Sequence, residues 1–505
     1  MVGKNGTSVA IVGAGASGVA CLIQLVIKHI VFRKTSPLLI SLFEKKEEFG
    51  PGLAYGTGQE GHLLNTRAGL MGILPEEPLH FVQWAHQHKE VIERKYGLCN
   101  IHPDTYPPRR LYGDYVRAML EHYCHEADRF NVVVKRERAD VIGATIDKKG
   151  QIMLATRDRR HRADYTILAT GNPMSNNFRH LERYQGYIPS PWPSTRILDV
   201  VRDKEAEVAI VGSSLTAIDA MITLVDNGHR GKIVFFSTEG LLPTVQPPVE
   251  RSYQRKVLTI SVIRRLMREQ QRTIRIKDLI RLYRAEVEQF VQHPVDWTAE
   301  VRAGKDHLAL LTSDIRDALS GGSIFQDILY SLRYESYPIW QLLPVDQKQL
   351  FGKWIKTEVD INRHAIPLRN GLKLKKLLES GQLRVIGQSK DIHQDDTGFE
   401  LKTEDGQTYR ADFVINATGP ATSIQQMNDQ PLLQQLLASG CIQEYGAGGL
   451  VVDLNTMRVL ASRSDPSPFY AVGHPLIGLQ HDVNALWFNV AQADKLTTDL
   501  IQRLP

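Results

Sequence analysis

The sequence has few cysteines, no long hydrophobic run and no large excess of charge of one sign. Only four of its 505 residues are cysteines, and no two of them form a Cys-x-x-Cys pair. This argues against a disulfide-stabilised secreted domain and removes the usual motif of dithiol redox enzymes, so we expect a reducing compartment. The 61 basic and 56 acidic residues nearly balance, which argues against a general nucleic-acid-binding surface.

No stretch is both long and apolar enough to predict a helix that spans a membrane. The most hydrophobic one, residues 19–32, contains Lys28 and His29 and is shorter than the roughly 20 residues that a spanning helix needs. The N-terminal residues lack the pattern of a cleaved signal peptide and lead directly into a predicted strand at residues 8–12. We therefore expect a cytoplasmic protein that binds neither membranes nor nucleic acid.

What the sequence does contain is a duplicated two-part pattern. The first copy opens with a hydrophobic run and a glycine-rich turn at residues 9–18, and it closes at residues 163–171 in Ala-Thr-Gly. The second copy opens at residues 208–217 and closes at residues 411–419, again in Ala-Thr-Gly. The pattern predicts two related α/β nucleotide-binding units, since the period is far too long for a solenoid.

Other segments complete this predicted organisation. Alternating runs at residues 132–157 and 383–403 predict a small β-meander before each closing segment. A stretch at about residues 253–378 is predicted to be mostly helical. Its beginning, residues 251–284, is strongly basic, which fits either a solvated helix face or a docking surface for an acidic partner or phosphorylated substrate.

The first turn has the pattern of a dinucleotide-binding motif. Gly13-x-Gly15-x-x-Gly18 follows a predicted strand and precedes an apolar helical pattern at residues 19–30. In such a turn the glycines allow a tight reversal, close approach of a pyrophosphate, and packing of helix on strand, while the helix N-terminus faces the phosphates. Glu44 ends the next predicted strand, where it can accept hydrogen bonds from the ribose hydroxyls. The predicted cofactor-binding residues here are Gly13, Gly15, Ala16, Ser17, Gly18, Glu44 and Lys45.

The second turn, Gly212-x-Ser214-x-x-Ala217, carries small residues in place of the second and third glycines. A serine-hydrolase elbow would need glycine where Thr216 stands. The predicted cofactor-binding residues of this turn are Gly212, Ser213, Ser214 and Thr216.

The strand predicted after the second turn, residues 232–236, ends in Ser237-Thr238-Glu239, where a second ribose would be read. No arginine is adjacent to bind a 2′-phosphate, and Glu239 would repel one. Arg251 or Arg255 would supply that charge if either folded back, so NADH and NADPH both stay open.

Further segments are predicted to contact a cofactor. Residues 50–56 and 62–66 are rich in glycine and polar groups, which suits a backbone that lies against a flat ligand, although an ordinary surface loop is the alternative. The predicted binding residues here and at the two closing segments are Tyr55, His62, Leu64, Asn65, Thr66, Thr170, Gly171, Thr418 and Gly419. No metal site is predicted: Cys124 lies in phase with Leu120 on a predicted helix at residues 112–127, which favours a packed thiol over a zinc ligand.

With these motifs in place, the chain resembles the two-dinucleotide-binding-domain flavoproteins. More closely, it resembles a bacterial FAD/NAD(P)-binding oxidoreductase family, similar to the flavin-dependent N-hydroxylating monooxygenases that include amino-acid N-oxygenases. The resemblance rests on the two turns, the Ala-Thr-Gly segments, and the following motifs: Gly52-Leu53-Ala54-Tyr55-Gly56, His62-Leu63-Leu64-Asn65, Pro108-Arg109-Arg110-Leu111-Tyr112-Gly113, Gly240-Leu241-Leu242-Pro243 and Arg363-His364.

The resemblance implies FAD on the first unit and NADPH or NADH on the second. It implies two Rossmann-like domains, the second inserted in the first: FAD-binding parts at residues 1–185 and 412–505, and an NAD(P)-binding domain at residues 186–411 with the helical insertion. The implied reaction uses molecular oxygen, through a C4a-(hydro)peroxyflavin, to N-oxygenate a small amine or amino-acid-like substrate. One alternative is a Baeyer–Villiger or carbon-hydroxylating monooxygenase that tailors a secondary metabolite, either free or bound to an acidic carrier protein that docks at the basic segment. The others are an NAD(P)H-dependent reductase or oxidase, and a non-catalytic nucleotide-binding sensor or assembly protein.

The sequence departs from related flavoproteins in two places. Gly473 is followed by His474 where an aspartate often binds the ribityl chain, and Asp482, at the start of a helix predicted over residues 482–502, offers a contact instead. The Baeyer–Villiger pattern lacks its histidine, since Gly186 is followed by Ser190 and Trp192.

No catalytic residue is identified, but Arg109 is a candidate. It is predicted either to anchor a substrate carboxylate or to form an ion pair within its own domain.

Overall fold

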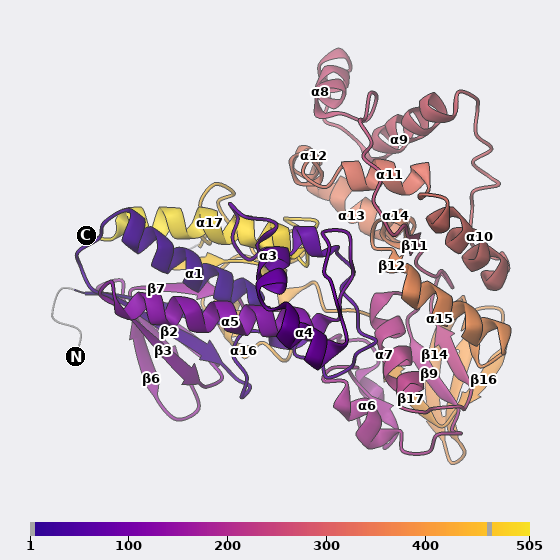
Figure 1. The fold of residues 1–505 in the computed structure, drawn as a ribbon, viewed down its shortest axis with the longest axis horizontal. Coiled ribbons are helices and arrows are strands. Elements are labelled where there is room, and N and C mark those ends of the chain that lie inside the picture. The colour runs from indigo at the N-terminus through magenta and orange to yellow at the C-terminus, as the bar shows by residue number, and fades with distance from the viewer. Residues whose placement is uncertain (1–5, 462–466) are drawn as a thin grey trace. The chain divides into compact units, whose positions relative to one another are not determined.

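The computed structural model describes residues 6–461 and 467–505, which form two compact units (Figure 1). The first unit comprises Met1–Glu60, Thr66–Met174 and Pro420–Pro505, and the second comprises Gly61–Asn65 and Ser175–Gly419.

The first unit is built on a parallel five-stranded sheet with the strand order β18-β7-β1-β2-β3. Strand β1 lies in the middle, and Val9 and Ile11 on it are almost fully buried, as expected for a parallel sheet covered on both faces. The strands are β1 (Thr7–Val12), β2 (Leu38–Glu44), β3 (Val132–Arg138), β7 (Tyr165–Leu168) and β18 (Phe469–Ala471).

Long helices cover this sheet. Helix α1 (Ala16–Val31) packs against both α5 (Arg109–Asp128) and α17 (Leu486–Arg503) (Figure 1). Lys28 on α1 contacts two residues of α17. Its Nζ forms an ion pair with Asp494 Oδ1 at 2.5 Å and a hydrogen bond with Thr497 Oγ1 at 3.0 Å. The remaining helices of the unit are α2 (Gly52–Tyr55), α3 (His80–Gln87), α4 (Lys89–Tyr96) and α16 (Pro431–Ala438).

The second unit has a closely related parallel sheet, with the order β13-β10-β9-β17-β8. Four strands correspond in the two units, because β9 is flanked by β10, β13 and β17 as β1 is by β2, β3 and β7. The fifth strand differs, since β18 follows β7 in the chain whereas β8 precedes β9. The α/β fold class with two related units is therefore confirmed. The elements are β8 (Tyr187–Ile188), β9 (Val208–Val211), β10 (Ile233–Phe236), β13 (Leu383–Ile386), β17 (Phe413–Asn416), α6 (Thr195–Val200) and α7 (Leu215–Asp226).

Both predicted meanders exist, but each begins later than expected. The antiparallel sheets are β4 (Gly143–Ile146), β5 (Ile152–Ala155) and β6 (Arg160–Ala163), then β14 (Ser389–Asp395), β15 (Gly398–Thr403) and β16 (Thr408–Ala411). The runs predicted to open them, β3 and β13, instead pair in parallel with β2 and β10. Both strands lie at the edge of their sheet, where part of their side chains are exposed. Buried and exposed residues therefore mix along each strand, as they do in the antiparallel strands of a meander.

A helical region lies between β10 and β13. Helices α10 and α15 share the hydrophobic core of the parallel sheet, whereas α8, α9 and α11–α13 surround a second core that contains Ile263, Val287 and Ile328. The elements are β11 (Val245–Gln246), α8 (Ile260–Glu269), α9 (Ile276–Val291), α10 (His307–Leu319), α11 (Ile324–Ser331), α12 (Ser336–Leu342), α13 (Val345–Trp354), α14 (Lys356–Arg363), β12 (Ile366–Pro367) and α15 (Leu368–Glu379).

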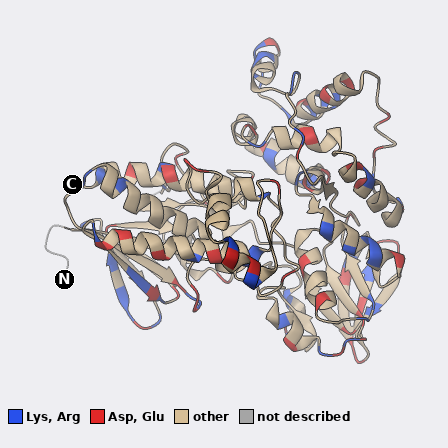
Figure 2. Ribbon diagram, viewed as in Figure 1, with Lys and Arg blue, Asp and Glu red and all other residues tan. Residues whose placement is uncertain are grey.

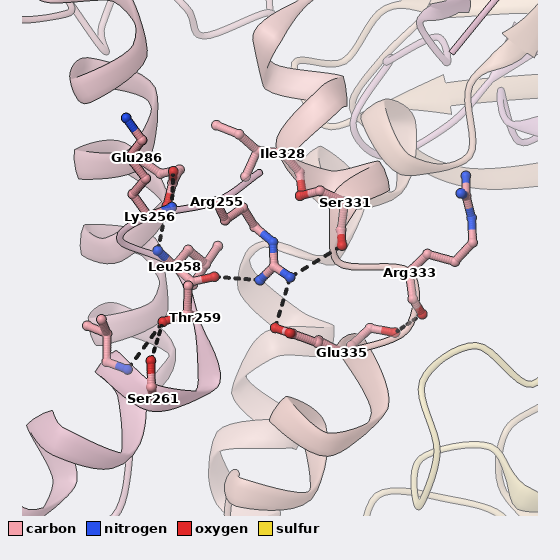
Figure 3. A network of polar contacts seen from close by, with 12 residues as sticks. Arg255, Lys256, Leu258, Thr259, Ser261, Glu286, Ile328, Ser331, Arg333 and Glu335 are labelled. Carbon is pink, nitrogen blue, oxygen red and sulfur yellow. Dashed lines mark hydrogen bonds and ion pairs between the residues drawn. The ribbon is translucent and has the colours of Figure 1, made fainter. Parts of the chain in front are cut away.

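The entry into this region is fixed by a buried carboxylate, Glu286 on α9 (Figure 3). Its oxygens accept hydrogen bonds from the backbone N–H groups of Lys256, Val257 and Leu258, at 2.8, 2.6 and 2.6 Å, and from the Tyr253 hydroxyl at 2.8 Å. Burial by itself raises the pKa of Glu286, but these hydrogen bonds outweigh burial and hold the pKa below its usual value.

We expect Glu286→Gln to lower the free energy of unfolding by about 2–4 kcal/mol, because an amide NH₂ would face backbone donors. The carboxylate has a lowered pKa in the folded state, so its stabilisation is present at neutral pH and is lost as the pH falls through that pKa. Denaturant unfolding should therefore show a large difference from wild type near pH 7 that shrinks below about pH 4.

Glu269→Gln, on the exposed end of α8, is the matched control and should change stability by less than about 0.5 kcal/mol. Equal effects of the two substitutions would contradict the role given to Glu286.

Candidate nucleotide-binding sites

The first glycine turn joins β1 to α1 with almost no free space around its backbone. Gly13 has a φ of +106°, and a methyl group at this position would lie 2.1 Å from the Ala169 carbonyl oxygen. A methyl group on Gly18 would lie 1.9 Å from the carbonyl oxygen of Gly13. Both distances are far below van der Waals contact, so the turn requires glycine at these two positions.

Other segments of the first unit meet this turn. A methyl group on Gly52 would lie 2.9 Å from the Gly15 Cα, and the Gly50 N–H donates to the Ala14 carbonyl at 2.8 Å. A methyl group on Gly473 would lie 3.7 Å from Ser17 Oγ, which puts this C-terminal glycine at the beginning of α1. Residues far apart in the sequence thus come together around the N-terminus of α1, which carries a partial positive charge.

Glu44 lies at the end of β2, beside the turn. Its Oε2 accepts a hydrogen bond from the Ala14 N–H at 3.2 Å, and its Oε1 accepts one from the Lys46 N–H at 3.1 Å. The carboxylate is therefore oriented by the backbone of the turn itself. This is the place where a carboxylate accepts from ribose hydroxyls in dinucleotide-binding folds. Lys45 is exposed.

The second turn repeats this geometry with more hydrogen bonds of its own. Gly212 has a φ of +117°, and a methyl group there would lie 2.8 Å from the Ala417 carbonyl oxygen. Ser213 Oγ donates to the Leu241 carbonyl at 2.6 Å and lies 3.0 Å from Ser237 Oγ. Ser214 is the N-cap residue of α7, where its backbone is extended.

The two Ala-Thr-Gly segments differ in how their threonines are bonded. Thr418 Oγ1 donates to Asn416 Oδ1 at 2.8 Å and lies 2.7 Å from Ser175 Oγ. Thr170 Oγ1 is buried without a hydrogen-bond partner among the described residues. Gly171 and Gly419 both have positive φ and open space where a side chain would stand.

Of the residues predicted around position 62, His62, Leu64 and Asn65 belong to the second unit. His62 is buried, and its Nε2 lies 2.9 Å from the Asp219 carbonyl and 3.0 Å from Thr223 Oγ1. The Asn65 carbonyl accepts from Gln246 Nε2 at 2.8 Å. These groups are therefore engaged by their own unit. Leu64 is buried in the same unit, whereas Thr66 begins a segment of the first unit.

Tyr55 and Arg109 both lie in the first unit. The ring of Tyr55 meets the edge of Tyr112 at 4.6 Å between centroids. Burial raises the pKa of Tyr55 to about 12, against an opposing effect of the positive charge of Arg109. Arg109 is the first residue of α5 and is 8% exposed. Its role as an anchor for substrate stays a prediction.

The helix predicted over residues 482–502 begins four residues later than expected. α17 starts at Leu486, and Asp482 lies in a preceding turn in which the Ala485 N–H donates to the Asp482 carbonyl at 3.0 Å. The prediction that Asp482 starts the helix was therefore wrong. Its carboxylate is almost buried, 3.3 Å from His481 Nδ1.

The sequence did not indicate the amides that contact Gly473. The Gly473 N–H donates to Gln492 Oε1 at 3.3 Å, and Gln492 Nε2 donates to Gln480 Oε1 at 2.5 Å. Asn489 also lies beside Gly473, and it donates to the Val483 carbonyl at 3.0 Å. Asn489 and Gln492 lie three residues apart on the buried face of α17, and polar residues on such a face are the signal that sequence reasoning overlooked.

All four cysteines are free. Cys124 packs less deeply than predicted: it is half-buried, and its Sγ lies 3.5 Å from Arg136 Nη2. Within residues 6–461 and 467–505, no three His, Cys, Asp or Glu side chains are grouped to hold a metal ion. No helix in the described part of the chain has the length and hydropathy needed to cross a membrane.

The comparisons with known proteins agree with this geometry. Residues 10–173 match a family described as FAD-NAD(P)-binding. The uncharacterized protein YdhS of Escherichia coli (strain K12) is 26% identical over 221 residues, which span 43% of this chain. The match covers only 39% of the length of that relative.

Solved structures share the fold over nearly the whole chain. An ornithine hydroxylase from Pseudomonas aeruginosa matches with a TM-score of 0.57 and 14% identity, covering 99% of this chain and 100% of that one. An L-lysine 6-monooxygenase from Pseudomonas syringae matches with a TM-score of 0.58 and 13% identity, over 99% of both chains. A bacillithiol disulfide reductase from Staphylococcus aureus matches with a TM-score of 0.50 and 10% identity, over 99% of this chain and 100% of that one.

The chain thus shares its fold with these solved enzymes, and residues 10–173 match a FAD-NAD(P)-binding family. The predicted resemblance is confirmed for the fold and for this domain.

We expect Gly18→Ala to lower the free energy of unfolding by about 1–3 kcal/mol, because the methyl group would overlap the Gly13 carbonyl and push α1 away from β1. The same displacement should reduce the amount of FAD that purifies with the protein. Gly58→Ala is the matched control, since nothing lies within 4 Å of a methyl group there. Wild-type flavin content in Gly18→Ala would contradict this account of the turn.

Proposed function

We propose that the chain is a flavin-dependent monooxygenase that uses NAD(P)H and molecular oxygen to N-oxygenate a small amine or amino-acid-like substrate. The observation that carries this proposal is the pairing, in one chain, of two units whose parallel sheets share the order of four strands around a glycine turn. The first of them matches a FAD-NAD(P)-binding family. A chain with two such units can hold a flavin on one and bind a nicotinamide nucleotide on the other.

The residues of the first unit fit FAD. The crowded turn at Gly13 and Gly18 brings bare backbone to the N-terminus of α1, where helix N–H groups and the helix dipole favour a pyrophosphate. Glu44 is held by Ala14 at the end of β2, where it would accept from the ribose hydroxyls. Gly473 presents a backbone without a side chain beside Ser17, at the start of α1.

The second unit would bind the nicotinamide nucleotide. Its turn at Gly212 leads into α7, so the same helix-terminus chemistry is available for a second pyrophosphate. When bound, FAD would accept a hydride from the nicotinamide and supply the oxygen chemistry. The chain's own contribution would be to bind both nucleotides, orient them and exclude water.

The substrate class is inferred by analogy. The two hydroxylating structures that share the fold are named for ornithine and lysine, both amino acids with a side-chain amine. Arg109, buried at the start of α5, is the residue we propose to hold a substrate carboxylate through paired hydrogen bonds.

A disulfide-reductase reaction that uses a cysteine pair is disfavoured, because the chain has no Cys-x-x-Cys pair. We propose that the reaction takes place in the cytoplasm.

An acidic carrier protein is a secondary proposal for the partner. Arg264 and Arg268 on α8 and Lys277 on α9 are exposed, and basic residues dominate α8 in Figure 2. Such a surface would attract an acidic protein that presents a bound substrate.

The test is to mix the purified flavoprotein with NADH or NADPH in air and to follow nucleotide oxidation and peroxide release. Ornithine, lysine and cadaverine are added in turn, and products are analysed by mass spectrometry. We expect one of the amines to speed nucleotide oxidation several-fold and to yield a product that is heavier by one oxygen atom.

The same assay with ketones tests the Baeyer–Villiger alternative. One result would overturn the proposal in favour of an oxidase or reductase. In that result, one peroxide forms for each nucleotide oxidised, and no amine gives an oxygenated product.

A further inference from the structure

Comparing the two units locates the residues that would contact the ribose of the second nucleotide. In the first unit, the parallel register sets Val12 opposite Phe43, and Glu44 is the next residue. In the second unit, Val211 lies opposite Phe236 in the same way, so Ser237 takes the position of Glu44. The acidic residue of this second strand end, Glu239, comes two residues later.

Ser237 is bonded to the turn around it. Its Oγ lies 3.0 Å from Ser213 Oγ and accepts a hydrogen bond from the Gly240 N–H at 3.0 Å. A methyl group on Gly240 would lie 2.8 Å from the Gly387 Cα, so the chain turns tightly after the strand. Glu239 is exposed within this turn, at the end of the sheet where the ribose lies in such folds.

A 2′-phosphate at this position would need a cation, and the next two arginines along the chain are committed elsewhere. Arg255 is buried, and it donates to the Leu258 carbonyl at 2.5 Å, to Glu335 Oε2 at 2.8 Å and to the Ser331 carbonyl at 3.3 Å (Figure 3). Arg251 donates through Nε to the buried carboxylate of Asp327 at 2.6 Å. Moving either arginine to the strand end would leave a buried carboxylate or carbonyl groups without a partner.

The other charged or titratable groups on the adjoining segments supply no second cation for a 2′-phosphate. Ser389 donates from its N–H to the Ser237 carbonyl at 3.1 Å, and the next residue, Lys390, lies 3.7 Å from Glu404 Oε2. His307 on α10 donates from Nε2 to the Gly240 carbonyl at 2.7 Å. The charged side chains on the turn and on β14 are thus one lysine, Lys390, and three carboxylates, Glu239, Asp391 and Asp395.

We propose that the second unit prefers NADH over NADPH, and that Glu239 is the residue that rejects the 2′-phosphate. The proposal rests on the proposed function, because it names the nucleotide that would reduce the flavin. A 2′-phosphate carries about two negative charges at neutral pH, so it would be repelled by Glu239, whereas a 2′-hydroxyl can donate a hydrogen bond to that carboxylate.

The experiment compares the two nucleotides on the FAD-loaded protein in two ways. Calorimetry gives the dissociation constants of NAD⁺ and NADP⁺, and anaerobic mixing gives the rate of flavin reduction by NADH and NADPH. We expect NADH to be preferred by about tenfold or more, and we expect this ratio to fall as salt screens the repulsion. Glu239→Gln should lower the preference by about three- to tenfold.

The matched control is Glu379→Gln. It removes the same charge from the same unit, but Glu379 ends α15 just before β13 begins, at the opposite end of the sheet from Glu239. This substitution should leave the ratio unchanged. A preference for NADPH in wild type, or equal shifts in the two variants, would overturn the inference. Flavin that neither nucleotide reduces would instead overturn the proposed function.

Discussion

The contact between the carbonyl of Gly13 and the Cα of Gly18 sets the geometry on which the first unit depends. It holds α1 so close to β1 that Gly18 has no room for a side chain, while the Ala169 carbonyl leaves none at Gly13. Because of this contact, the start of α1 faces the carboxyl end of the sheet, where Glu44, Gly52 and Gly473 converge. The pyrophosphate site that we propose there follows from backbone packing, and the side chains only refine it.

The second unit shows how the same scaffold can be changed. The contact of Gly212 with Ala417 keeps the tight turn, while Ser213 and Ser237 replace the link between Ala14 and Glu44 with a pair of hydroxyl groups. Thr418 likewise bonds within its own unit, whereas Thr170 in the first unit has no described partner. More of the polar side chains at the second turn are therefore hydrogen-bonded within their own unit than at the first turn.

The sequence predicted those parts of the fold that follow from local pattern. The hydrophobic runs and glycine turns indicated β1, α1, β9 and α7, because strand, turn and helix are encoded within a few residues. The sequence did not predict that β3 and β13 join parallel sheets, since edge strands alternate as meander strands do. The amides Asn489 and Gln492 were also missed, because only the folded chain brings α17 to Gly473, and for the same reason the internal partners of His62 did not emerge.

The measurement that tests the central claim most directly is the flavin content of the purified protein. The protein is denatured, and the released chromophore is identified by chromatography and counted against the chain. The account predicts FAD, at close to one molecule per chain, and its loss on substitution at the first turn but not at the second. A chain that purifies without flavin and fails to take up added FAD would contradict the assignment of the first unit, and with it the proposed reaction.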